Sequence, residues 1–175
     1  MVIKHPTQIG NSVIRNKARP VRDVKSARTK RIVRNLIDSM RHHGLVGMAA
    51  PQIGIGLRIF VTEIRKTTTR SPKQLDPVRV FINPNIVSRS KKQVLGGEGC
   101  GSVAHGGLFA QVRRPERVIA EAFDQKRCKF TVAAKGLLAR IIQHETDHLD
   151  GTVFLDRLPN MKGLMSREEY MKRRR

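Results

Sequence analysis

The sequence contains little acid, few aromatic residues, few cysteines and no long apolar run. Its 175 residues include 14 acidic residues, one Tyr, two Cys and no Trp. No segment approaches the roughly 18 consecutive apolar residues that a membrane-spanning helix requires, so we expect no membrane partner. The opening residues also lack the apolar stretch of a secretory signal. These absences favour a cytoplasmic protein without a signal or transit peptide.

The shortage of cysteine and aromatic residues excludes two further classes. Cys100 and Cys128 are too few for a disulfide framework, which favours a reducing compartment. Aromatic residues make up 4% of the chain, too few for the stacking platforms that read single-stranded nucleic acid. Basic residues are abundant instead, and 35 Lys and Arg give a net charge of +21. This charge predicts attraction to phosphate backbones, although a solvated cationic surface would explain it equally well.

The size and composition predict one domain. Hydrophobic residues form 39% of the chain, which is enough for a single core. We therefore expect one domain over 1–175, with a basic tail at 166–175. The order of predicted elements is helix, strands, helix, with short connections, which is typical of the α+β class. We expect small antiparallel or mixed sheets packed around a C-terminal helix, with an amphipathic helix near the N-terminus.

The positions of these elements follow from apolar spacing and from turn residues. Helical spacing predicts a basic amphipathic helix of about sixteen residues that ends before Gly44, and a second helix over 133–149. The glycine-rich residues 45–56 are expected to form a tight loop, and 83–85 a turn. Strand-like runs lie at 58–62, 80–82, 117–123 and 129–132.

The strongest local pattern is His144-Glu145-Thr146-Asp147-His148 in the second predicted helix. Histidines four residues apart on a helix lie on one face, within reach of one metal ion. A glutamate beside the first histidine can accept a proton from water. Residues 145–156 hold four acids and no Lys or Arg. In so basic a chain this indicates a negative island suited to a cation.

A catalytic metal site of this kind needs a third protein ligand. Phe154 stands where one branch of metalloproteases has a third histidine, so that branch is excluded. Glu168 or Glu169 downstream and Cys100 upstream remain as candidates. Glycines on both sides of Cys100 allow close backbone approach, and a metal would hold its sulfur as thiolate. A buried inert thiol is the alternative for Cys100 alone, but beside the histidine pair we favour a ligand.

Three segments of the chain carry motifs that belong together. They read LVGMAAPQIG at 45–54, EGCGS at 98–102 and QHETDHL at 143–149. In order and spacing they resemble the three signature motifs of the peptide deformylase family. The opening residues, with Pro6 and ARPV at 18–21, are similar to the start of that family. The resemblance therefore covers nearly the whole chain.

The resemblance implies a metal-dependent amidohydrolase that removes the N-formyl group from N-formylmethionine of nascent polypeptides and releases formate. It also implies one divalent metal ion, held by Cys100, His144 and His148. Fe²⁺ is the expected metal, and Zn²⁺, Ni²⁺ or Co²⁺ could substitute for it, because these donors suit several divalent ions.

The family's catalytic roles fall on three further positions. Glu145 would take a proton from the attacking water and hand it to the departing amine. The side-chain amide of Gln52 and the backbone N–H of Gly101 would donate to the oxyanion that develops on the formyl group. Removal of one such donor typically lowers kcat by ~100-fold or more.

The resemblance also implies a methionine-sized apolar pocket and residues that orient the metal ligands. The expected pocket residues are Val46, Gly47, Leu137 and Ile141. Plain core packing is the alternative for Leu137 and Ile141. Glu98 and Arg114 would orient a ligand histidine and Asp147. An ordinary surface salt bridge is the alternative for Arg114.

The sequence departs from the family pattern at Leu45, Met48, Gly101 and Arg113. Leu45 stands where the first motif usually has Gly, and Gly101 stands where the second usually has Leu. Gly101 keeps its N–H but adds backbone freedom and lacks a side chain near the substrate. We expect these changes to alter KM or specificity more than the chemistry.

The expected partners are N-formylmethionyl peptides and, from the +21 charge, the ribosome or its RNA. The basic face of the first helix and residues 66–73 and 172–175 are the candidate contact surfaces. We expect a monomer. Two other functions remain open at this point: a catalytically weakened deformylase-like protein that binds ribosomes or RNA, and a metallopeptidase.

Overall fold

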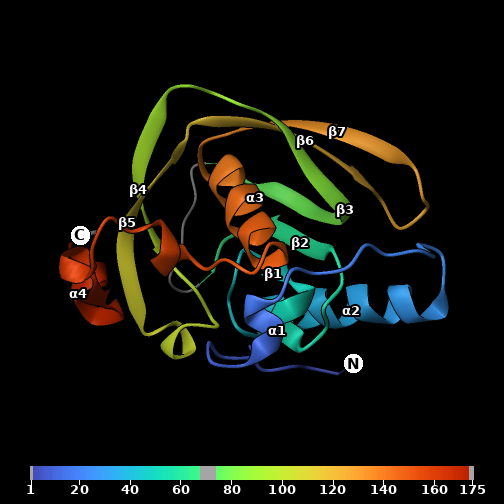
Figure 1. The fold of residues 1–175 in the computed structure, drawn as a ribbon, viewed down its shortest axis with the longest axis horizontal. Coiled ribbons are helices and arrows are strands. Elements are labelled where there is room, and N and C mark those ends of the chain that lie inside the picture. Colours follow the sequence, from blue (N-terminus) through green and yellow to red (C-terminus); the bar gives the residue numbers. More distant parts are fainter. Residues whose placement is uncertain (1, 68–73, 174–175) are drawn as a thin grey trace.

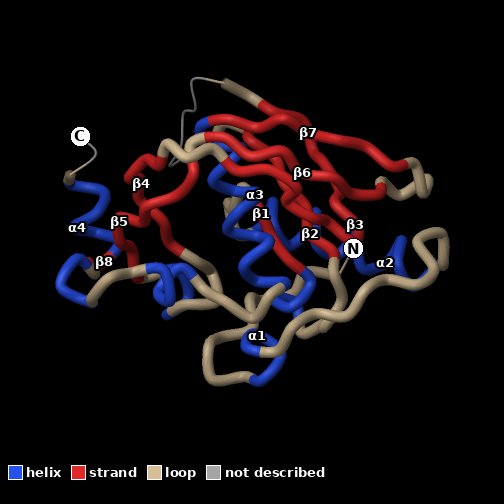
Figure 2. The backbone as a smooth tube through the Cα atoms, turned by 45° about the horizontal axis from the view of Figure 1, so that its top comes forward, coloured by secondary structure: helices blue, strands red, loops and turns tan. Residues whose placement is uncertain are grey.

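Helix α3 (Gly136–Leu149) runs between two antiparallel β-sheets (Figure 1). The computed structural model describes residues 2–67 and 74–173. A turned view of the backbone again places α3 between the strands β4, β5 and β8 on one side and the larger sheet on the other (Figure 2). This arrangement confirms the α+β class and the C-terminal helix at its centre.

The larger sheet has five strands in the order β1-β2-β3-β6-β7, and all neighbours pair antiparallel. The strands β1, β2, β3, β6 and β7 span Gly47–Ala49, Ile59–Ile64, Asp76–Arg89, Arg117–Phe123 and Lys129–Lys135. The long strand β3 changes register against β6 between Ile82 and Asn85 and again between Ile86 and Ser88. Such bulges bend a strand, so β3 can follow the curve of the sheet.

The smaller sheet has the order β4-β5-β8 and includes three strands that the sequence analysis missed. They span Gln93–Gly99, Leu108–Pro115 and Met165–Ser166. β4 and β5 form a regular antiparallel hairpin from Gln93↔Pro115 to Gly99↔Phe109. Because β4 ends at Gly99, the hairpin fixes the position of the cysteine that follows.

The predicted amphipathic helix is confirmed as α2 (Ala27–His42). Ser26 caps its start by accepting a hydrogen bond from the Thr29 N–H, and Gly44 follows its end with a φ of 65°. Leu36 and Met40 are fully buried against the larger sheet. The short helices are α1 (Ser12–Arg15), α4 (Arg167–Lys172) and the 3₁₀ turns Ala50–Ile53, Ala104–Gly106, Phe154–Arg157 and Met161–Gly163.

The prediction of a loop over 45–56 is wrong in its first half. Gly47–Ala49 is strand β1, and Ala50–Ile53 is a 3₁₀ turn. Gly47 and Ala49 in β1 suggested a loop because they lack bulk. They instead allow the strand to lie between β2 and helix α3, and pairing with β2 overrides the weak local propensity.

Two other boundaries also need correction. The C-terminal helix begins at Gly136 rather than 133, because residues 133–135 pair with Arg117–Ile119 as the end of β7. Gly136 has a φ of 59°, which reverses the chain between strand and helix. The expected turn at 83–85 lies inside β3. Asn83 instead forms a bulge residue with a φ of 51°, and its amide bonds to both backbone groups of Val21.

Three hydrophobic clusters hold these layers together. One lies between α3 and the larger sheet and contains Phe60 and Phe81, whose rings stack at 4.5 Å. The second lies between α2 and the same sheet. The third lies under β5 and contains Ile14 and Cys100. The N-terminal segment thus packs directly beside the cysteine that the sequence analysis singled out.

The C-terminal residues do not form a simple basic tail over 166–172. Ser166 belongs to β8, and α4 follows with Tyr170 stacked on Phe109 of β5 at 4.5 Å. Residues 68–73 and 174–175, where part of the expected basic surface lies, are outside the described residues. Among the described helices, none is long and apolar enough to cross a membrane.

Candidate active site

Cys100, His144 and His148 come together between the smaller sheet and α3. Their donor atoms lie within 4.8 Å of one another, and Cys100 Sγ is 3.2 Å from His148 Nε2. Cys100 and His148 are 3% and 1% exposed, and the His144 side chain is 12% exposed. One thiolate and two imidazoles suit a divalent transition metal and leave a coordination position open. The residues therefore fit a metal ion.

The environment of Cys100 favours its thiolate form. Burial alone would raise the pKa of Cys100, but the neighbouring His148 and His144 hold it well below its ordinary value. The N–H of Ser102 and Nε2 of Gln52 point to the sulfur at 3.4 and 3.6 Å. Donors around the sulfur stabilise a thiolate, which is the form that binds metals.

Glu98 orients His144. It lies near the end of β4, is 5% exposed, and its Oε2 is 2.9 Å from His144 Nδ1. Burial alone would raise the pKa of Glu98, but hydrogen bonds from Arg114 and His144 hold it well below its usual range. An ionised carboxylate only accepts hydrogen bonds, so Nδ1 of His144 carries the proton. Nε2 of His144 is then the nitrogen left to bind a metal.

Arg114 connects the two sheet strands to the metal-binding helix. From β5 it donates to Glu98 with Nε at 2.7 Å and Nη2 at 2.8 Å, and to Asp147 with Nη1 at 2.7 Å. Arg114 is 4% exposed, so this is a buried ion pair rather than a surface salt bridge. The carboxylates around it raise the pKa of Arg114 even though burial alone would lower it.

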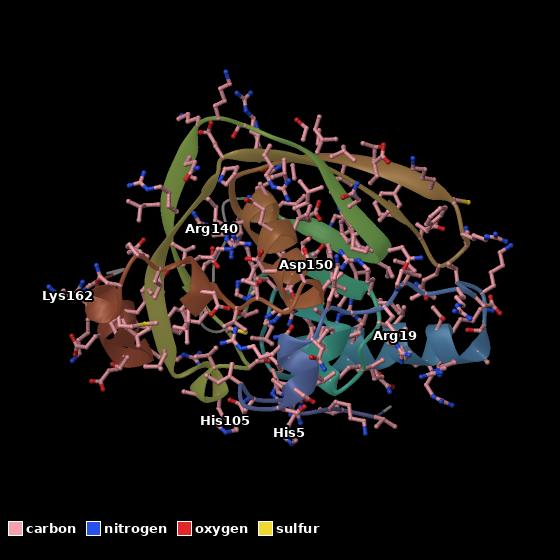
Figure 3. The ribbon with its side chains drawn as sticks, in the orientation of Figure 1. His5, Arg19, His105, Arg140, Asp150 and Lys162 are labelled. Atoms are coloured by element: carbon pink, nitrogen blue, oxygen red, sulfur yellow. The ribbon has the colours of Figure 1, made fainter. Side chains whose placement is uncertain are left out.

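Two further arginines complete this network, and the sequence analysis missed both. Arg140 donates to Glu98 at 2.6 Å and to three backbone carbonyls of β4 and β5, and Figure 3 shows it between α3 and these strands. Arg157 binds Asp147 at 2.5 and 3.2 Å. A signal existed for Arg140: it stands four residues before His144, a charged residue on the same helix face as a proposed ligand.

Glu145 lies beside the ligands and against the backbone of β1. It is 4% exposed, and its Oε2 has no hydrogen-bond partner among the described residues. Burial raises the pKa of Glu145 to about 7. A Cβ added to Gly47 would overlap Glu145 Oε1 and lie 2.8 Å from Ile141 Cγ2. Glycine at position 47 therefore makes room for this carboxylate.

Gln52 points its amide N–H₂ group at the site. Its Oε1 accepts a hydrogen bond from the Ala49 N–H at 2.8 Å, which fixes the orientation of the amide. Nε2 therefore faces Cys100 Sγ and lies 3.4 Å from Ser102 Oγ. Gly101 follows the cysteine, and the carbonyl of Gly101 accepts a hydrogen bond from Gln8 at 2.8 Å.

The four expected pocket residues divide into two groups. Gly47 is buried and Ile141 is 4% exposed, and the two are in contact. Val46 is half-buried directly before β1, and Leu137 is 40% exposed one turn before Ile141 on α3. The structure thus brings Gly47 and Ile141 to Glu145 and leaves Leu137 at the surface.

The expected negative island around the motif is wrong, because arginines from other segments neutralise it. Asp147 pairs with Arg114 and Arg157, Asp150 with Arg58, and Asp156 with Arg15. These partners are distant in sequence, which hid them from a local reading. Glu145 is the acid of this stretch that has no ion pair among the described residues. The alternative metal ligands Glu168 and Glu169 are exposed and both pair with Lys172.

Comparisons with known proteins agree with this geometry. The family model for polypeptide deformylase matches residues 3–163. A peptide deformylase of Natranaerobius thermophilus is 37% identical over 90% of this chain and 93% of that protein. One of Treponema pallidum is 37% identical over 86% of this chain and 85% of that protein.

Solved structures of the same kind have the same fold. A K4U-bound class I type b peptide deformylase from Acinetobacter baumannii has a TM-score of 0.85 at 29% identity, covering 90% of this chain and 99% of that chain. The peptide deformylase of Thermotoga maritima has a TM-score of 0.80 at 28% identity, covering 91% and 100%.

A buried cysteine and an H-E-x-x-H helix between two antiparallel sheets define a metal-dependent hydrolase. The family match and the curated relatives extend over most of the chain. The chain belongs to the polypeptide deformylase family, hydrolases that remove the formyl group from the N-formylmethionine of polypeptides.

Proposed function

We propose that this deformylase holds one divalent metal ion, Fe²⁺ in the cell, through Cys100, His144 and His148. The observation that carries the proposal is the burial of these three donors within 4.8 Å of one another. The same donor set would accept Zn²⁺, Ni²⁺ or Co²⁺, because a thiolate and imidazoles suit several divalent ions. A metal held there supplies Lewis acidity to the formyl carbonyl and to the attacking water.

Glu145 is the proposed proton carrier of the reaction. Its Oε2 is buried without a hydrogen-bond partner among the described residues, so one oxygen is available to a water molecule or to substrate. It lies next to His144 in the chain and therefore at the edge of the proposed metal site. Glu145 would accept a proton from the attacking water and return it to the departing amine.

Gln52 and Gly101 are the proposed donors to the oxyanion. The Ala49 N–H holds the Gln52 amide so that Nε2 faces Cys100. The backbone N–H of Gly101 comes directly after the cysteine. Donors that are fixed in advance stabilise developing charge without reorganisation, and each is typically worth ~100-fold or more in kcat.

N-formylmethionyl peptides are the proposed substrates, with Val46, Gly47, Leu137 and Ile141 around the methionine side chain. The contact of Gly47 and Ile141 with each other and with Glu145 supports this placement. Glu98 and Arg114 are proposed as positioning residues. Their hydrogen bonds to His144 and Asp147 hold α3 in the orientation that the reaction requires.

We further propose that residues 1–175 form one catalytic domain that acts as a monomer in the cytoplasm, in contact with ribosomal RNA. The +21 charge supports the contact, and Arg28, Arg31 and Arg34 are exposed on α2. Cosedimentation with ribosomes should then occur at low salt and weaken as salt rises. Cosedimentation that ignores salt, or none at low salt, would contradict the electrostatic contact.

The assay that tests the catalytic proposal is formate release from formyl-Met-Ala-Ser by protein loaded with Fe²⁺ or Ni²⁺. We expect metal-dependent release, and its loss in Glu145→Ala with the fold retained. Thermal unfolding provides a second measurement: added metal should raise Tm in the wild type but not in Cys100→Ala, because ligands that bind only the folded state stabilise it.

Each result separates the proposal from its alternatives. A rise in Tm without formate release would indicate a catalytically weakened protein that still binds metal. Absence of both effects would falsify the proposed metal site. Cleavage of internal peptide bonds in an unformylated peptide would instead indicate a metallopeptidase.

A further inference from the structure

A cavity lies beside the metal-binding helix, on a face other than the one that carries the two histidines. Its volume is about 370 Å³. Gln143, Thr146 and Asp147 line it from α3, at spacings of three and four that define one helix face, and Asp150 lines it from the C-cap of the helix. His144 and His148 point to a different face. The opposite walls are the end of β3, the start of β4 and the end of β5, so the cavity occupies the corner between the two sheets.

Basic side chains outnumber acidic ones around this cavity. Four arginines and two aspartates line it: Arg89, Arg113, Arg114, Arg157, Asp147 and Asp150. Asp147 is already paired twice, with Arg114 and Arg157. Asp150 forms an ion pair at 2.7 Å with Arg58, which does not line the cavity. Neither carboxylate is therefore available to neutralise another cation.

Arg89 and Arg113 are the two arginines left over. Both are exposed, and neither side chain has a hydrogen-bond or ion-pair partner among the described residues. Arg89 ends β3 and Arg113 lies near the end of β5, so separate strands hold them at the same opening. Two unpaired guanidinium groups that share a concave site favour an anionic ligand.

We propose that this cavity is a binding site for a phosphate group, held by Arg89 and Arg113. A guanidinium group presents parallel N–H donors that match two phosphate oxygens. Two guanidinium groups can bind one phosphate from opposite sides. The cavity volume is within the range of small-ligand sites, so the cavity has room for a phosphate group and for atoms attached to it. A free phosphate and a backbone phosphate of RNA share this chemistry.

The test measures binding of inorganic phosphate and of a 12-nucleotide single-stranded RNA, at fixed ionic strength. NMR titration follows the side-chain amide of Gln143 in the cavity wall, and anisotropy of labelled RNA gives affinity. The test variant is Arg89→Gln/Arg113→Gln. The matched control is Arg22→Gln/Arg127→Gln, which removes two exposed arginines that also lack partners among the described residues. Circular dichroism and Tm check that all three proteins are folded.

We expect one or both ligands to shift the Gln143 resonance. The affinity should fall at least tenfold in the cavity variant and less than threefold in the control. Phosphate binding alone would identify a free phosphate as the ligand, and cavity-dependent RNA binding that phosphate competes away would identify a backbone phosphate. Equal losses in both variants, or no shift at Gln143 with either ligand, would overturn the proposal. No activity is measured, so the outcome is independent of the proposed catalytic roles.

Discussion

At the scale of single residues, Gly47 shows how closely the backbone approaches the proposed proton carrier. A Cβ at this position would overlap Glu145 Oε1 and lie 2.8 Å from Ile141 Cγ2. We predict that Gly47→Ala displaces Glu145 and lowers kcat by about 100-fold, the usual scale for a 1 Å misplacement of a catalytic group. Formate release at saturating substrate measures the effect.

The matched control for Gly47 is Gly163→Ala. No heavy atom lies within 4 Å of a Cβ built at Gly163, so this substitution should leave kcat within about twofold of wild type. A Gly47→Ala protein with wild-type kcat would show that Glu145 has room to spare or does not carry the proton.

Leu45 and Gly101, two of the departures from the family pattern, are neighbours in space. A Cβ added to Gly101 would lie 3.5 Å from Leu45 Cδ1 and 3.0 Å from Pro6 Cγ. Leu45 thus occupies space beside position 101, where the family usually has the larger side chain. We infer that the two departures compensate each other: the side chain of Leu45 fills space that a larger side chain at position 101 would otherwise occupy.

A double-mutant cycle tests this compensation. Gly101→Leu alone should crowd Leu45 and reduce kcat/KM by at least tenfold, and Leu45→Gly alone should leave a gap. The combined Leu45→Gly/Gly101→Leu protein should recover part of the loss, with a coupling of about 1–2 kcal/mol, as is usual for side chains in contact. Strictly additive effects on kcat/KM would show that the two positions are independent.

The residues most accessible from sequence alone were those whose chemistry depends on local spacing. His144, Glu145 and His148 lie within one helical turn, so their shared location followed from helix geometry. Cys100 is distant in sequence, so its place beside the histidines did not follow from spacing; its flanking glycines favoured it over Glu168 or Glu169, and the resemblance to a family supported that choice. The ion-pair partners of Asp147, Asp150 and Asp156 come from remote segments, and no local pattern marks them.

At the scale of secondary-structure elements, the buried ion pairs join β4, β5 and α3. The single side chain of Arg114 donates both to Glu98 of β4 and to Asp147 of α3. We predict that Arg114→Met lowers the free energy of unfolding by about 3–5 kcal/mol, because it leaves two buried carboxylates short of a partner. It should also weaken metal binding by about 10- to 100-fold, because Glu98 would no longer hold His144 firmly. Urea unfolding and metal titration measure the two effects.

Arg113→Met is the matched control for this prediction. Arg113 is the preceding residue on the same strand, but it is exposed and its side chain has no partner among the described residues. Its replacement should change the free energy of unfolding by less than about 0.5 kcal/mol and leave metal affinity unchanged. If both variants lose stability equally, the effect comes from charge or strand propensity rather than from the buried network.

Elements with strong periodicity were predictable, and elements defined by tertiary pairing were not. The period of α2 and the β-branched run of β6 determined both from local sequence. The glycines of β1 and β4 carry no side-chain signal, because they leave space for neighbours such as Glu145 and Arg140. In such strands the structure depends on the side chains and strands that pack against the glycines, and these come from distant parts of the sequence.

At the scale of the whole molecule, the charge is arranged in two different ways. Two of the buried acids, Glu98 and Asp147, pair with Arg114, whereas Glu145 has no ion pair among the described residues. Most of the remaining basic residues are on the surface and face solvent, and the net charge is +21. The positive charge therefore lies outside a site that is locally balanced. It bears on encounter with anionic partners rather than on hydrolysis.

This surface charge should also affect stability. Like charges on a compact molecule repel one another, and with 35 basic residues against 14 acidic ones repulsion outweighs the attraction of surface ion pairs. Raising ionic strength from about 0.01 M to about 0.1 M shortens the Debye length from about 30 Å to about 10 Å. We predict that Tm rises by about 2–5 °C over this range, equivalent to about 1 kcal/mol for a chain of this size. Thermal unfolding in sodium chloride and sodium fluoride at matched ionic strength measures it. Equal rises in both salts indicate screening, whereas a constant or falling Tm would show that the acidic residues already balance the surface.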